Sequence, residues 1–169
     1  MTSAKNKRII GALTAERGHN VPRKFKPISW KEFPKNKKVI EGTNCLAFAL
    51  GIKNPKRKHR YVLKMTAEPM ETIFLKKVKK LGFNPQIFKQ IDQDKEKEKK
   101  GYVIRVYGFE PEETEDGIMY DFHVIRREPN GQWVHKPGFD YLPRKVTERD
   151  WRIIFEKFGN KFISFAIET

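Results

Sequence analysis

The sequence is poor in cysteine and in long apolar segments, and its acidic residues are fewer than its basic ones. Of its 169 residues only one is a cysteine, so no disulfide can form within the chain, and Cys45 is free for core packing, catalysis or metal binding. No segment approaches the ~20 consecutive apolar residues that a membrane-spanning helix needs. The basic N-terminal segment is not followed by an apolar stretch of about 7–15 residues, so we expect no ordinary signal peptide.

Positive charge is abundant by comparison. There are 36 Lys and Arg residues against 21 Asp and Glu, a formal net charge of +15. Such an excess predicts an anionic partner, for example nucleic acid, a polyanionic cell wall or an acidic membrane surface. Solubility alone is the alternative explanation.

The basic residues concentrate in two segments. Residues 1–27 show neither helical nor strand periodicity and contain several Gly and Pro residues, so we expect a flexible arm there and one domain over 28–169. A second basic cluster extends from Lys53 to Lys64. The predicted nucleic-acid-binding residues are Lys5, Lys7, Arg8, Arg17, Arg23, Lys24 and Lys26 in the arm, and Lys56, Arg57, Lys58 and Arg60 in the cluster.

The hydrophobic pattern predicts helices first and strands later. Thr43 and Asn44 can cap a short apolar helix that has Cys45 in its first turn. Apolar spacings of three and four predict helices over 66–81 and 147–158, and alternation predicts strands over 101–109, 119–127, 132–136 and 162–167. The segment 92–100 is expected to be an exposed loop or a frayed helix end. This order favours an α+β fold, with the cysteine-bearing helix packed on an antiparallel sheet.

A predicted hairpin brings two histidines together. Its turn, Pro129-Asn130-Gly131, suits a three-residue loop with Gly131 in the left-handed conformation. That loop places Glu128 opposite Gln132, so that paired residue numbers sum to 260. His123 and His135 then lie diagonally on one face of the hairpin, within reach of each other. A two-residue Asn-Gly loop would instead send them to opposite faces.

One cysteine and two histidines allow three interpretations. A free cysteine on an apolar helix is usually a core residue. In a thiol hydrolase, a helix N-terminus and an imidazolium both favour the thiolate, and a third polar group orients the imidazole. A zinc site is the third possibility, but it needs a further ligand such as His59 or Asp121, and no close CxxC or HxxxH pair is present.

These residues also resemble a known group of enzymes. The segments NCLAFALG (44–51), DFH (121–123) and WVHKPG (133–138) are similar in order to the NlpC/P60-type papain-like hydrolases, and most of all to small bacterial and phage members with an Asn-Cys helix and a DxH…NGxWxHKPG hairpin. The resemblance covers roughly residues 43–138. It implies a papain-like fold and a peptide or peptidoglycan substrate. The expected lack of a signal peptide and the high basic charge fit a cytoplasmic or phage-virion location better than ordinary secretion, and we expect no cofactor.

The sequence therefore supports two functional hypotheses. In the first, a thiol hydrolase cleaves amide bonds, with Cys45 as nucleophile, His123 as base and His135 orienting His123. The usual Asp-Cys-Ser-Gly motif and the usual oxyanion-stabilising Gln are absent, which leaves the backbone amide of Cys45, helped by Asn44, as the expected oxyanion donor. In the second, a basic nucleic-acid-associated or virion protein keeps the papain-like fold without catalysis.

Overall fold

The structure is a computed structural model that describes residues 22–52, 61–114 and 117–168. Its central element is an open six-stranded antiparallel sheet in the order β1-β6-β2-β3-β4-β5. The strands are β1 (Phe88–Ile91), β2 (Val103–Thr114), β3 (Gly117–Arg127), β4 (Trp133–His135), β5 (Arg144–Lys145) and β6 (Phe162–Ile167). The predicted α+β class with an antiparallel sheet is confirmed.

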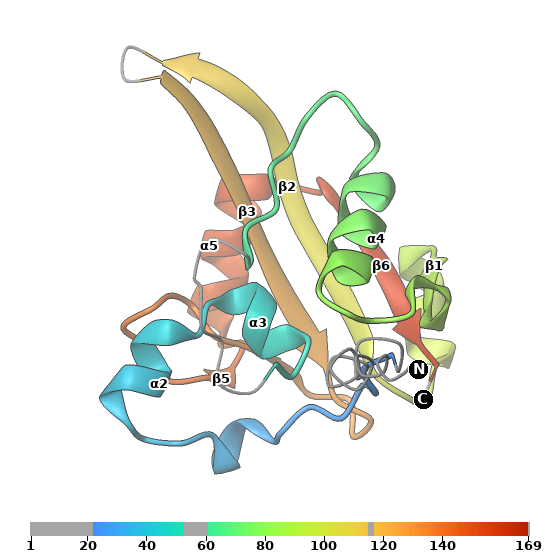
Figure 1. Cartoon of the computed structure of the whole chain (residues 1–169), viewed down its shortest axis with the longest axis vertical. Helices are drawn as coiled ribbons and strands as arrows, with labels where there is room; N and C mark the ends of the chain where they lie inside the picture. Colours follow the sequence, from blue (N-terminus) through green and yellow to red (C-terminus); the bar gives the residue numbers. More distant parts are fainter. Residues whose placement is uncertain (1–21, 53–60, 115–116, 169) are drawn as a thin grey trace, which may run out of the picture.

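Helices cover both faces of this sheet (Figure 1). The α-helices are α2 (Lys37–Gly42), α3 (Cys45–Ala49), α4 (Met70–Lys80) and α5 (Glu148–Phe158), and short 3-10 helices occur at η3 (Trp30–Glu32), η5 (Pro85–Ile87) and η6 (Gln93–Glu98). The main core joins α3 and α4 to alternate residues of β2 and β3 such as Ile104 and Val124. A second core places α5 on the opposite face, around Tyr107 and Ile125.

The short helix α3 is held at both ends by polar contacts. The Asn44 side chain accepts a hydrogen bond from the Ala47 amide at 2.9 Å, which satisfies one of the open donors of the first turn. At the other end the buried guanidinium of Arg126 donates to the carbonyl of Phe48 at 2.9 Å. All five residues of α3 are buried. The predicted helix with Cys45 in its first turn is confirmed.

Other predicted boundaries need correction. The helix expected over 66–81 begins only at Met70, because Pro69 takes the N-cap position. Two strands, β1 and β5, and the helix α2 were not predicted, since each is too short to show a periodic pattern. Within the segment 92–100, Gln93–Glu98 form η6, and the residues of the segment are exposed as expected except Glu96, which is buried.

The predicted flexible arm also ends earlier than residue 27. Phe25 is buried and packs its ring against Phe88 and Tyr102. Arg23 donates its backbone amide to the Gly82 carbonyl and its Nε to the Leu81 carbonyl. Residues 22–27 therefore belong to the domain, and the rest of the predicted arm lies outside the described residues.

Candidate active site

The hairpin of β3 and β4 has the predicted register. Arg126 pairs with Val134 and Arg127 with Trp133, and the Glu128 amide donates to the Gln132 carbonyl at 2.8 Å. Gly131 has a φ of 92°, the left-handed conformation that the three-residue loop requires. The numbers of the paired residues sum to 260, so the predicted register of the hairpin is confirmed.

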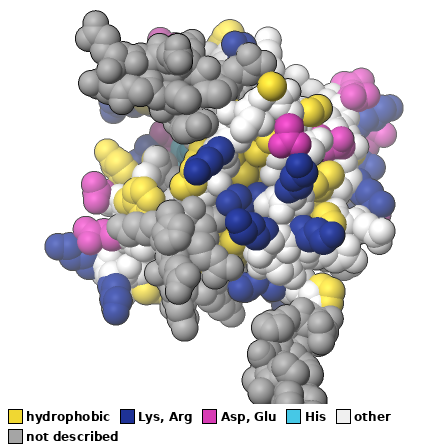
Figure 2. Space-filling model, turned by 45° about the horizontal axis from the view of Figure 1, so that its top comes forward, with side chains coloured by type: hydrophobic (Ala, Val, Ile, Leu, Met, Phe, Trp, Pro, Cys, Tyr) yellow, Lys and Arg dark blue, Asp and Glu magenta, His cyan; other side chains and the backbone are white. Residues whose placement is uncertain are grey.

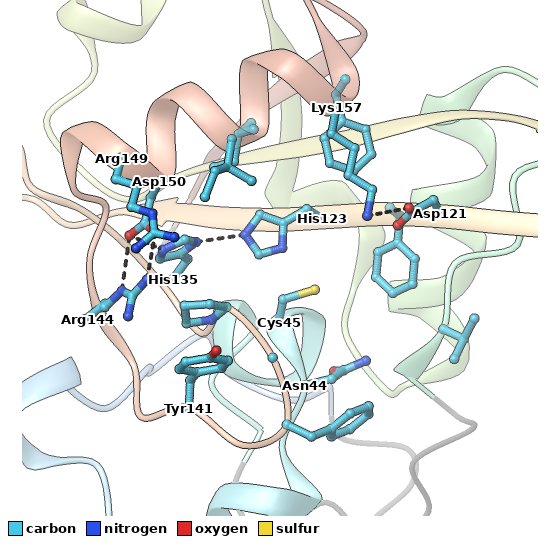
Figure 3. A pocket seen from close by; sticks show the side chains of 18 residues that line it. Asn44, Cys45, Asp121, His123, His135, Tyr141, Arg144, Arg149, Asp150 and Lys157 are labelled. Carbon is cyan, nitrogen blue, oxygen red and sulfur yellow. Dashed lines mark hydrogen bonds and ion pairs between the residues drawn. The ribbon is translucent and has the colours of Figure 1, made fainter.

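The two histidines meet as that register predicts. The Nε2 atom of His123, on β3, lies 2.8 Å from the Nδ1 atom of His135, at the end of β4. Pairing between the strands is confined to Arg126, Arg127 and their partners, so β3 and β4 separate toward His123. The helix α3 packs against both strands and brings Cys45 beside the histidines (Figure 3).

A buried carboxylate decides which nitrogen carries each proton. The Nε2 atom of His135 lies 3.0 Å from Oδ2 of Asp150, and a carboxylate can only accept, so His135 carries its proton on Nε2. Burial lowers the pKa of His135, so its ring is neutral and its Nδ1 atom is an acceptor. His123 therefore donates from Nε2. The unprotonated Nδ1 atom of His123 is left free, and Figure 3 shows this second ring nitrogen turned to the side where the Cys45 sulfur lies.

Asp150 and its partner Arg144 were not predicted as site residues. Asp150 is buried in the first turn of α5, where it forms a capping box with Thr147. Arg144, on β5, donates from Nη2 to Oδ1 of Asp150 at 2.7 Å and from Nε to Oδ2 at 3.1 Å. The Thr-x-x-Asp pattern indicates a helix cap in the sequence, but it carries no sign that the same carboxylate contacts a histidine.

The catalytic candidates line one open cavity of about 560 Å³. Cys45, His123 and His135 line it together with residues of α5 and of the segment 137–144 (Figure 3). Cys45 is 9% exposed, so its sulfur is almost enclosed by protein. The site thus combines a nearly buried thiol with a cavity large enough for part of a peptide.

The electrostatics of the free site favour neutral side chains. Burial raises the pKa of the Cys45 thiol to about 11, although hydrogen bonds from the backbone of Val124 and Leu46 act in the opposite direction. Burial, and then the neighbouring His135, lower the pKa of His123 to about 3. No hydrogen bond joins the described side chains of Cys45 and His123. The expected thiolate–imidazolium pair is therefore not the resting state, which is a thiol beside a neutral base.

The two predicted oxyanion donors, the backbone amide of Cys45 and the side chain of Asn44, differ in whether they are available for a hydrogen bond. Cys45 is the first residue of α3, so its backbone amide is one of the open donors of the first turn. The side chain of Asn44 is engaged: Oδ1 accepts from Ala47, and Nδ2 donates to the Tyr61 carbonyl at 2.6 Å. The backbone amide is thus the better candidate, and Asn44 acts first as the helix cap.

The geometry does not favour the zinc alternative. The facing nitrogens of His123 and His135 are joined by a hydrogen bond at 2.8 Å, so they cannot both bind one ion. Asp121, a possible further ligand, is paired with Lys157 at 2.6 Å, and His59 lies outside the described residues. Within the described ranges no group of three or more His, Cys, Asp or Glu side chains could hold a metal ion.

Most of the predicted nucleic-acid-binding residues lie outside the described residues, and the structure places only Arg23, Lys24 and Lys26. Lys24 and Lys26 are exposed, whereas Arg23 is fixed to the domain through Leu81 and Gly82. The residues not described are Lys5, Lys7, Arg8, Arg17, Lys56, Arg57, Lys58 and Arg60.

Comparison of the chain with protein-family models, with curated proteins and with solved structures found no match. Within the described ranges, no helix is both long and apolar enough to cross a membrane. Any functional conclusion must therefore come from the chemistry of the site.

Proposed function

We propose that the protein is a papain-like thiol hydrolase of the NlpC/P60 type, which cleaves amide bonds in a peptide or a cell-wall peptide. One observation carries the proposal: a hydrogen-bonded series from Asp150 through His135 to His123 leaves a free imidazole nitrogen in the cavity that Cys45 lines. Each member has a role that catalysis needs, namely nucleophile, base and orienting group.

The neutral resting state sets how the reaction begins. The Cys45 sulfur attacks the carbonyl carbon while its proton passes to Nδ1 of His123. The positive charge that forms on His123 is stabilised through His135 by the Asp150 carboxylate. The backbone amide of Cys45 donates to the oxyanion.

Breakdown of the tetrahedral intermediate completes the reaction. The C–N bond breaks as the proton on His123 passes to the departing amine, which leaves an acyl group on the Cys45 sulfur. Water, deprotonated by His123, then attacks the thioester carbonyl, and the carboxylic acid and the free thiol are released. Each proton removed by His123 is thus returned, and no cofactor takes part.

The test compares the parent protein with Cys45→Ala on two substrates, purified cell-wall muropeptides and an unfolded polypeptide such as casein. We expect the parent to cleave at least one of them and the variant to cleave neither. Brief reaction followed by acid quenching should reveal, by mass spectrometry, an acyl adduct on Cys45. Cleavage by the variant at the parental rate, or no cleavage of either substrate by the parent, would contradict the proposal.

The second candidate function is binding to nucleic acid. It is supported by the net charge of +15 and by the many Lys and Arg side chains that gather on the face shown in Figure 2. Removing residues 1–21 would delete Lys5, Lys7, Arg8 and Arg17 without disturbing the buried Phe25. If half of these contact phosphates, the log–log salt slope for duplex DNA should become shallower by about two units. An unchanged slope would remove this segment from the interface.

A further inference from the structure

The cavity that holds Cys45 carries an unbalanced positive charge. Three cationic side chains and two carboxylates line it. Arg144 is paired with Asp150 at 2.7 Å and Lys157 with Asp121 at 2.6 Å. Arg149, the third cation, contacts no carboxylate within the described part of the chain.

An apolar surface lies next to that cation. Ile153 follows Arg149 by four residues on α5, so both side chains lie on one face of the helix, about 6 Å apart along its axis. Across the cavity, the segment 137–144 contributes the rings of Phe139 and Tyr141. Ile153, Phe139 and Tyr141 are 47%, 39% and 54% exposed, so they present apolar surface to this cavity.

The segment that carries these rings is held in place. The buried Lys136 donates from Nζ to the carbonyls of Gly138 at 2.6 Å and Phe139 at 3.1 Å. At the other end of the segment, Arg144 is fixed by its two hydrogen bonds to Asp150. The exposed rings therefore belong to an anchored wall of the cavity, whose apolar surface is available to a ligand.

We propose that this cavity selects substrates that carry a carboxylate beside an apolar side chain, with Arg149 binding the carboxylate and Ile153, Phe139 and Tyr141 contacting the apolar group. The inference rests on the proposed function, because it names the substrate class of the same site. A cation without a described carboxylate partner and the apolar side chain of Ile153 one helical turn away match an amino-acid unit in which a carboxylate and an apolar side chain are neighbours.

The first experiment uses Cys45 itself as the reporter and needs no hydrolysis. Iodoacetate and iodoacetamide both alkylate the thiolate with loss of iodide, but only iodoacetate carries a carboxylate. Their rate ratio cancels the thiolate fraction and is compared with the ratio for free N-acetylcysteine. We expect the ratio at Cys45 to favour iodoacetate, and Arg149→Ala to lower this preference roughly three- to tenfold.

The matched control is Arg152→Ala, which removes an exposed cation from the same helix but not from the cavity wall. It should leave the ratio within twofold of the parental value. Equal ratios for the parent and Arg149→Ala, or an equal effect of both substitutions, would overturn the role of Arg149. Because alkylation does not depend on catalysis, these outcomes differ from a failure of the proposed function, which would appear as absent hydrolysis.

The second experiment tests the apolar wall with N-benzyl iodoacetamide, compared with iodoacetamide. Ile153→Ala should reduce the preference of Cys45 for the benzyl reagent at least threefold. Phe155→Ala is the control, since Phe155 is 56% exposed on the same helix and does not line the cavity. A benzyl preference that is absent from the parent, or lost equally in both variants, would overturn the apolar part of the proposal.

A third measurement identifies the source of the carboxylate. N-acetyl-phenylalanine presents an α-carboxylate, N-acetyl-phenylalanyl-glutamate α-amide presents a side-chain carboxylate, and N-acetyl-phenylalanine amide presents none. Protection of Cys45 from iodoacetamide by the first compound assigns a C-terminal carboxylate, and protection by the second assigns an acidic side chain. Protection by the neutral amide alone, or by none of the three, would overturn the proposal.

Discussion

Two buried polar networks lie on the face of the sheet that α5 covers, and they end differently. In one, Glu96 accepts from Arg105 at 2.8 and 2.6 Å and from Ser164, and Arg105 also donates to Tyr107. In the other, Arg144, Asp150, His135 and His123 follow in series. Glu96 and Arg105 of the first, closed network also line a cavity, but their charges are paired with each other. The second, open network leaves a free imidazole nitrogen in the cavity beside Cys45.

The closed network has the features of a structural element. The guanidinium of Arg105 lies over the rings of Trp133 and Phe162, at 4.7 and 4.4 Å from their centroids. Its charge is matched by Glu96, and both side chains are mostly buried. By contrast, the open network leaves a lone pair on Nδ1 of His123 without a partner among the described residues. Burial and ionic pairing alone therefore do not mark a functional site. A series of hydrogen-bonded side chains that ends in a free nitrogen inside a cavity is the better indication of one.

The largest expected effect, a loss of kcat/KM, comes from removing the imidazole of His123 at the end of the open network. His123→Ala should lower kcat/KM on the cleaved substrate by about 10³-fold or more, because His123 is the base that the structure places beside the Cys45 thiol. His135→Asn should cost far less, since an amide can still accept from His123. Steady-state kinetics of the two purified variants measures the difference. Equal losses would argue against the roles assigned to the two histidines.

Breaking the closed network should affect stability instead of catalysis. Glu96→Gln leaves the Arg105 charge buried without its partner, so we expect the free energy of unfolding to fall by about 3 kcal/mol. Glu98→Gln is the control, because Glu98 is exposed and its ion pair with Lys95 spans 3.5 Å; it should cost less than about 0.5 kcal/mol. Urea unfolding measures both. A large loss of kcat in folded Glu96→Gln would contradict the assignment of a purely structural role to the closed network.

Asp150 contacts both His135 and Thr147, and two substitutions can separate the effects of these contacts. Asp150→Asn should lower kcat by about 10- to 100-fold, because a neutral amide no longer stabilises the charge that forms on the histidine pair. Thr147→Ala removes the other half of the capping box and should cost about 1 kcal/mol of stability with kcat nearly unchanged. Steady-state kinetics and urea unfolding of both variants show whether Asp150 supports catalysis or only caps α5. Similar kcat values for the two variants would leave Asp150 with the capping role alone.

A further expected effect concerns the pH dependence of stability. The pKa of His123 is about 3 in the folded protein, below its ordinary value of about 6.5. As the pH falls below 6.5, the unfolded state binds the proton first, so the free energy of unfolding should fall by up to about 1.4 kcal/mol per pH unit. His123→Gln should show a shallower dependence between pH 6.5 and 4.5 in urea unfolding. An unchanged slope would mean that His123 does not titrate as a buried neutral base.

Local signals predicted the parts of the fold that depend on neighbouring residues. Asn44 caps α3 because its side chain reaches amides three residues ahead, and Pro129-Asn130-Gly131 sets the hairpin register because the turn geometry is local. The contact between His123 and His135 followed from that register. Local signals did not predict β1 and β5, because these strands are too short to show a periodic pattern. They also did not predict the burial of Glu96, because that burial depends on its pairing with Arg105.

What the sequence alone determined is thus the cysteine-bearing helix, the hairpin and the pairing of its histidines. Tertiary structure alone decided that Asp150 and Arg144 complete the series, because α5 and β5 meet the histidines only once the sheet is packed. It also decided the protonation states. The sequence places Cys45 at a helix N-terminus, which favours a thiolate, but the desolvation of a packed core outweighs this effect and raises the pKa of the thiol to about 11. Burial depends on every element around the sulfur, and no local pattern encodes it.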